Sequence, residues 1–64
     1  MPQDPYNILQ VARHAEPEVI EAAYRRLARK YHPDTNTSAN ATAHLQDINW
    51  AYDILKDPAK RIRS

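Results

Sequence analysis

The sequence contains neither cysteine nor glycine. Without cysteine, disulfides and thiolate metal sites are excluded, so a fold this small must be stabilised by packing alone. Without glycine, phosphate-cradling loops, dinucleotide fingerprints and most tight hairpin turns are excluded as well. Strands therefore have little support, and helices are the expected elements.

Long apolar runs are also missing. No run approaches the ~18 residues that a membrane-spanning helix needs, and residues 1–4 lack the charged and apolar regions of a signal peptide. The chain has 64 residues, and a domain of this size buries only about 60% of the surface that its unfolded chain exposes. We expect one soluble, cytoplasmic domain over residues 1–64, of marginal stability.

Positive charge is concentrated in one segment. The whole chain has a net charge of only +1. Residues 21–31 alone have a net charge of +3, because Glu21 is the one acidic residue among four basic ones, Arg25, Arg26, Arg29 and Lys30. Such a segment steers an acidic partner surface and makes association depend on salt.

Proline and capping residues predict where helices begin. Asp4 suits the N-cap and Pro5 the first helical position, and the same pair recurs at residues 57 and 58. Pro17 begins a longer helix. A cap for the helix after it lies among Thr37, Ser38 and Asn40. The sequence therefore predicts an all-α fold with helices over residues 5–10, 17–31, 40–56 and 58–63.

Two apolar stripes at helical spacing predict the core. The first consists of Ile20, Ala23, Leu27 and Tyr31, with Tyr24 and Ala28 along its border, and the second of Ala41, Leu45, Ile48, Tyr52 and Leu55. The connection between the two helices favours antiparallel packing. Trp50 and Ile54 fall outside the second stripe, so we expect an exposed apolar pair that the remainder of a longer chain or a partner covers.

The tripeptide His32-Pro33-Asp34 separates the two long helices. Pro33 has no backbone N–H and pushes the residue before it out of the helical region, so the first helix should end near Tyr31. An imidazole and a carboxylate then flank a rigid ring at the exposed tip of a helix pair. Asp34 can accept a charge-assisted bond from an arginine of a partner, and the fixed turn loses little entropy on binding.

The basic segment forms the outer face of the first long helix. Arg25 and Arg29 lie nearly opposite the core stripe, and Arg26 and Lys30 form a second row on its flank. Glu21 is spaced to pair with Arg25, an interaction worth only about 0.2–0.5 kcal/mol.

The sequence does not contain the residue patterns expected of a metal site or a catalytic site. His14, His32 and His44 lack the spacing of metal ligands, and neither cysteines nor clustered carboxylates complete a site. We expect His14 and His44 to be surface side chains. A catalytic pair of His32 and Asp34 would lack both a nucleophile and a chain long enough to wall a pocket. The chain is therefore not expected to be an enzyme, and no cofactor is expected.

Five segments together resemble the J-domain of the DnaJ family: Asp4-Pro-Tyr-Asn-Ile-Leu9, Ala23-Tyr-Arg-Arg-Leu-Ala-Arg-Lys-Tyr-His-Pro-Asp34, Ile48-Asn-Trp-Ala-Tyr52, Leu55-Lys-Asp-Pro58 and Lys60-Arg61. The resemblance covers nearly every residue. It implies four helices, with an antiparallel hairpin of the second and third whose loop carries the His-Pro-Asp signature.

The resemblance also implies a co-chaperone activity. Members of the family bind the ATPase of DnaK-type (heat shock protein 70) chaperones and stimulate ATP hydrolysis during protein folding. By position, the signature is His32, Pro33 and Asp34, and the basic docking helix contains Tyr24, Arg25, Arg26, Arg29 and Lys30. Tyr24 is expected to serve both the core and the partner contact.

The sequence departs from the family pattern at several positions. Gln10 stands where glycine is usual, Leu45 where phenylalanine is common and Trp50 where glutamate is common. Glu21 and Ala22 replace frequent basic residues, so the docking face is less positive at its start. The usual Tyr-Asp of the fourth helix is missing, and no region that binds client proteins follows. We expect the chain to be the N-terminal fragment of a longer protein.

The main alternative is a small helical module that binds nucleic acid. Three helices and a basic face are a generic signature of such modules. The acidic tip at Asp34 argues against it, because a carboxylate beside the arginines would repel phosphate. Salt-titrated binding to DNA would separate the two functions.

Overall fold

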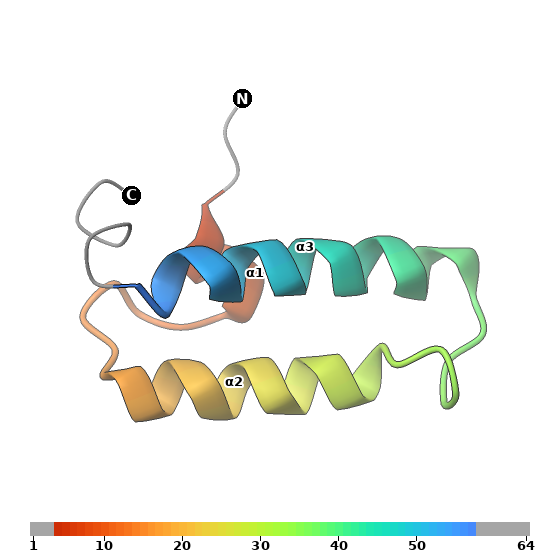
Figure 1. Cartoon of the computed structure of the whole chain (residues 1–64), viewed down its shortest axis with the longest axis horizontal. Coiled ribbons are helices and arrows are strands. Elements are labelled where there is room, and N and C mark those ends of the chain that lie inside the picture. Colours follow the sequence, from red (N-terminus) through yellow and green to blue (C-terminus); the bar gives the residue numbers. More distant parts are fainter. Residues whose placement is uncertain (1–3, 58–64) are drawn as a thin grey trace.

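The computed structural model describes residues 4–57. Within this range the chain forms three helices and no strand: α1 (Pro5–Leu9), α2 (Pro17–Lys30) and α3 (Ala39–Leu55). α2 and α3 run antiparallel as a hairpin, and α1 packs mainly on α3 and less on α2 (Figure 1). The all-helical expectation therefore holds for these residues, and the predicted helix over 58–63 lies outside them. No helix among them is long and apolar enough to span a bilayer.

The start of α1 follows from the Asp-Pro pair. The Asp4 carboxylate accepts a hydrogen bond of 2.9 Å from the backbone N–H of Tyr6, as an N-cap should. The helix ends at Leu9, one residue before the predicted limit of 10, and the C-cap residue Gln10 has φ 59° and ψ 44° in the left-handed region. Two bonds of 3.0 Å close this end, from Gln10 N–H to the Asn7 carbonyl and from Val11 N–H to the Tyr6 carbonyl.

The long helices begin where proline and serine predict. Pro17 opens α2, and the side chain of Glu16 makes no capping bond, which agrees with its rank as a poor cap. The Ser38 hydroxyl caps α3 by accepting from the Ala41 N–H at 3.2 Å. α2 ends one residue before the predicted limit of 31, and α3 lies one residue earlier at both ends than the predicted range 40–56.

The core forms where the three helices meet. Its buried side chains are Tyr6, Leu9, Ala15, Ile20, Ala23, Leu27, Ile48, Ala51 and Leu55. Ala41 is buried as well. Tyr24, Tyr31 and Tyr52 are half-buried and pack against this cluster. Three members of each predicted stripe are therefore buried, whereas Leu45 and the three tyrosines lie at the edge.

The prediction that Trp50 and Ile54 form an exposed apolar pair is wrong for Ile54. Trp50 is 42% exposed, but Ile54 is half-buried and packs against the core cluster. The prediction considered only α2 as the partner of α3. Because α1 packs on a second side of α3, the buried face widens to include Ala51, which the stripe omitted, and Ile54 at its border.

We predict that Gln10→Gly stabilises the domain. A residue with a side chain is disfavoured in the left-handed region by about 1–2 kcal/mol, and glycine adopts it readily. A net gain of about 1 kcal/mol raises the melting temperature of a domain this small by roughly 4–8 °C. Thermal unfolding followed by circular dichroism measures this shift.

Gln10→Ala is the matched control. It removes the same polar side chain but keeps the Cβ atom, so its melting temperature should not rise. An equal rise in both variants would mean that the amide group, and not the backbone conformation, limits stability at this turn.

Candidate functional site

The His-Pro-Asp corner lies at the end of the hairpin and faces solvent. α2 ends at Lys30, the backbone turns at Tyr31, and His32, Pro33 and Asp34 follow as exposed residues. The Asp34 side chain is 88% exposed and that of His32 is 51% exposed. The corner is therefore free of the core, as its sequence predicts.

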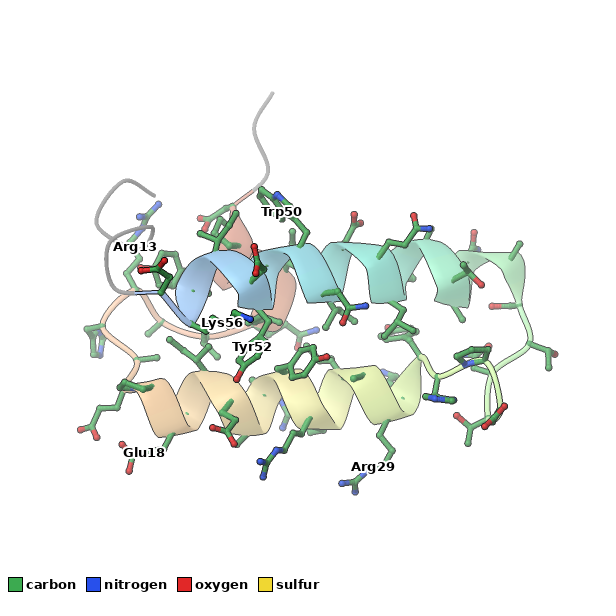
Figure 2. All side chains as sticks on the ribbon, viewed as in Figure 1. Arg13, Glu18, Arg29, Trp50, Tyr52 and Lys56 are labelled. Carbon is green, nitrogen blue, oxygen red and sulfur yellow. The ribbon has the colours of Figure 1, made fainter. Side chains whose placement is uncertain are left out.

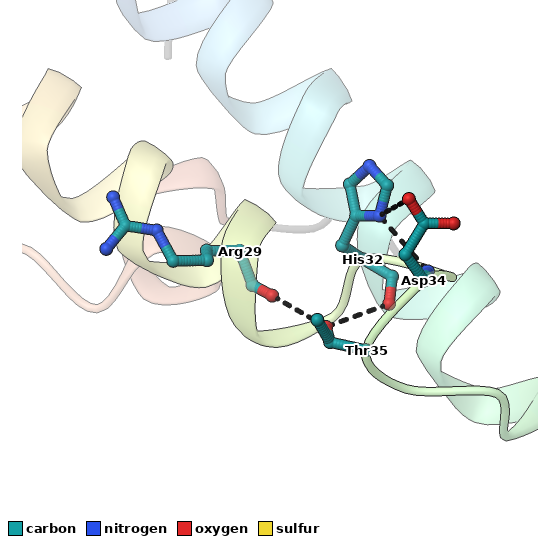
Figure 3. Close-up of polar contacts among 4 residues, drawn as sticks. All are labelled: Arg29, His32, Asp34 and Thr35. Carbon is teal, nitrogen blue, oxygen red and sulfur yellow. Dashed lines mark hydrogen bonds and ion pairs between the residues drawn. The ribbon is translucent and has the colours of Figure 1, made fainter.

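The carbonyl of His32 closes the turn. It accepts backbone bonds from the N–H of Thr35 at 3.0 Å and from the N–H of Asn36 at 2.8 Å. The Thr35 hydroxyl lies 3.2 Å from the same carbonyl and 3.1 Å from the carbonyl of Arg29 (Figure 3). One side chain thus joins the last turn of α2 to the corner.

The part that Thr35 plays in the corner is not among the features predicted from the sequence. A signal for it exists, because threonine hydroxyls often bond to carbonyls three or more residues earlier in the chain. Here the bond to Arg29 spans six residues. That reach depends on the turn at Pro33, so spacing alone does not predict it.

The His32 ring is held by the residue two positions later. Its Nδ1 accepts the backbone N–H of Asp34 at 3.1 Å and lies 3.6 Å from Oδ2 of the same residue (Figure 3). Because Nδ1 acts as an acceptor, the proton of the neutral imidazole is inferred to lie on Nε2. The corner then offers an N–H donor beside a carboxylate acceptor. A doubly protonated ring would lose the backbone bond and pair with the carboxylate.

The basic side chains occupy the exposed surface of α2. Arg25 forms an ion pair with Glu21, as the spacing predicts. Arg26, Arg29 and Lys30 are exposed. Arg29 points away from α3 (Figure 2), and its guanidinium extends away from His32 and Asp34 (Figure 3). The Lys30 ammonium lies 5.4 Å from the centre of the Tyr31 ring.

Tyr24 lies in the seam between the long helices. Its ring stacks on Tyr52 with centroids 4.1 Å apart and planes 10° apart, and its hydroxyl donates to Asn49 Oδ1 at 3.0 Å. The Lys56 ammonium lies 5.9 Å from the centre of the Tyr52 ring, beside α3 (Figure 2). Tyr24 is half-buried, and it joins α2 to α3.

The other histidines are exposed, as expected. His14 lies in the connection between α1 and α2, and His44 packs on Tyr31 with ring centres 4.8 Å apart. Among the residues described, no group of three histidines or carboxylates is placed to hold a metal ion.

A helical hairpin that presents a His-Pro-Asp corner is the arrangement that defines a J-domain. The sequence matches the model of the DnaJ domain family over residues 4–63, and the chain belongs to this family. It is 56% identical over 64 residues to the chaperone protein DnaJ of Carboxydothermus hydrogenoformans, covering 98% of this chain. It is 52% identical over 63 residues to the chaperone protein DnaJ of Trichormus variabilis, again covering 98% of this chain. In both cases the chain spans 17% of the length of that relative.

We predict that Thr35→Val loosens the corner. Valine keeps the shape of threonine but removes the hydroxyl that contacts the carbonyls of Arg29 and His32. Because these groups are exposed, the free energy of unfolding should fall by only about 0.5–1.5 kcal/mol. Backbone order parameters from NMR relaxation should fall at residues 32–36 and stay unchanged in α1.

Thr35→Ser is the control, since serine retains the hydroxyl. Its order parameters should match those of the unchanged chain. Unchanged order parameters in Thr35→Val would show that the hydrogen bonds of the hydroxyl do not hold the corner, and loosening in Thr35→Ser alone would assign its rigidity to the methyl group.

Proposed function

We propose that the chain is a co-chaperone module that binds a DnaK-type chaperone through the basic surface of α2 and the His-Pro-Asp corner, and stimulates its ATP hydrolysis. The observation that carries this proposal is the exposed and hydrogen-bonded corner at the end of α2. Family membership supports it, because relatives that share the domain are named as DnaJ chaperones.

The corner supplies a strong and directional contact. The Asp34 carboxylate is 88% exposed, so binding an arginine of the partner does not require it to leave a buried position. A carboxylate and a guanidinium form a charge-assisted, bidentate pair. Pro33 and the bonds of Thr35 already order the backbone, so little further conformational entropy is lost on docking.

The α2 surface supplies attraction at longer range. Glu21 neutralises Arg25 at the start of this surface, but Arg26, Arg29 and Lys30 continue it toward the corner. Their field favours an acidic partner and weakens over the Debye length, about 8 Å at physiological salt. Docking should therefore slow as salt is added, with the corner fixing the orientation.

Stimulation acts through the partner's conformational equilibrium. The chain would bind more tightly to the partner conformation that hydrolyses ATP, and its effect is limited by this difference in affinity. The bond to the γ-phosphate breaks in the partner's ATP site, so the chain itself is not the enzyme. Client proteins would be bound by regions outside these 64 residues.

Single-turnover ATP hydrolysis by a DnaK-type chaperone tests the proposal. Addition of the chain should accelerate hydrolysis, and His32→Gln and Asp34→Asn should each reduce the acceleration about tenfold or more, within the range of allosteric coupling energies. His14→Gln and Asp53→Asn make the same chemical changes at exposed positions away from the corner and should keep the full acceleration.

Melting temperatures of all variants establish that each one is folded. Equal acceleration by the corner variants and the unchanged chain would remove the corner from the mechanism. Tight DNA binding that weakens steeply with salt, together with no effect on the ATPase, would instead favour the nucleic-acid module.

A further inference from the structure

A hollow of about 290 Å³ lies where α1, the second half of α2 and the first half of α3 meet. Ile8, Leu27 and Ile48 give it an apolar lining, and Gln10, Tyr31, His44 and Asp47 add polar or aromatic groups. The volume is at the small end of ligand sites in proteins, which span about 300–1,000 Å³. The hollow is therefore suited to one side chain and not to a larger cofactor.

Asp47 gives this hollow a negative charge that no basic residue in the range 4–57 neutralises. Its side chain is half-buried, yet the carboxylate makes no hydrogen bond or ion pair with any residue in the range 4–57. Asp4 and Glu21 are half-buried as well, and they pair with Arg13 and Arg25. A carboxylate that has lost part of its water without gaining a partner favours a cation that supplies both charge and N–H donors.

The aromatic rings beside Asp47 also favour a cation. Tyr31 and His44 lie with ring centres 4.8 Å apart and planes 31° apart. The Tyr31 ring already attracts the Lys30 ammonium, at 5.4 Å from its centre. A planar guanidinium both stacks on such rings and matches a carboxylate through two N–H groups, which an ammonium does not.

We propose that this hollow binds the side chain of an arginine from a partner protein. The alkyl stem packs on Ile8, Leu27 and Ile48, and the guanidinium pairs with Asp47 beside the two rings. The hollow is separate from the exposed surface of α2, which is basic and attracts acidic groups. It is also separate from Asp34, which is proposed to pair with a different arginine of a partner. It does not require the ATPase stimulation proposed above.

The probe is the peptide acetyl-Leu-Arg-Leu-amide, compared with acetyl-Leu-citrulline-Leu-amide, in which a neutral urea replaces the guanidinium. Each is titrated into the 64-residue chain labelled with nitrogen-15. We expect the amide signals of Tyr31, His44 and Ile48 to shift with the arginine peptide. Its dissociation constant should be lower than that of the citrulline peptide by about tenfold or more, the range of a charged hydrogen bond.

Two variants locate the binding. Asp47→Asn should abolish the preference for arginine over citrulline, whereas Asp53→Asn, the same change at an exposed position of α3, should keep it. Asp34→Asn should keep it as well, which distinguishes the hollow from the corner.

Several outcomes would overturn the proposal. These are equal affinity for both peptides, a preference that survives Asp47→Asn, signal shifts confined to the corner, and no binding of the arginine peptide. None of them bears on the ATPase experiment, because that experiment changes only residues outside the hollow.

Discussion

The turn at Pro33 is the constraint on which the rest of the structure depends. A proline there prevents α2 from continuing, because it lacks the backbone N–H and its ring disfavours a helical conformation at His32. The chain reverses direction, and the carbonyl of His32 accepts hydrogen bonds from the backbone N–H groups of Thr35 and Asn36. Reversal places α3 antiparallel to α2, which joins Tyr24 to Tyr52 and Tyr31 to His44. The proline at position 33 thus accounts for both the exposed corner and the antiparallel pairing of the helices.

The reversal also keeps different charges on different parts of the surface. The cations of α2 lie on its outer side because its apolar stripe faces α3 and α1. Asp34 lies at the tip, beyond the last turn of α2, and Asp47 lies in the hollow between the helices. A protein that engages several of these groups must therefore present acidic and basic groups in a fixed order, which favours one orientation of docking.

Much of the fold could be predicted from local chemistry. The cap at Asp4, the start at Pro17 and the burial of Ile20 and Leu27 each depend on a few neighbouring residues, and the structure has them as predicted. The unpredicted features depend on contacts between distant segments. Ile54 and Ala51 are covered because α1 packs on α3, and Asp47 lines a hollow that the three helices form together, where no residue in the range 4–57 pairs with its carboxylate. The hydroxyl bond from Thr35 to Arg29 likewise exists only after the chain has reversed.

The core is uneven along the hairpin. Its largest fully buried side chains are Leu9, Ile20 and Leu55, and the last two lie at the start of α2 and the end of α3, opposite the corner. The half of the hairpin near the corner buries Leu27 and Ala41 but leaves Tyr31 and Leu45 half-buried. Local opening of the helix ends therefore costs less near the corner than at the opposite end of the hairpin. The helix ends beside the corner can open without unfolding the far end of the hairpin, while the turn itself stays ordered by Pro33 and by the hydroxyl of Thr35.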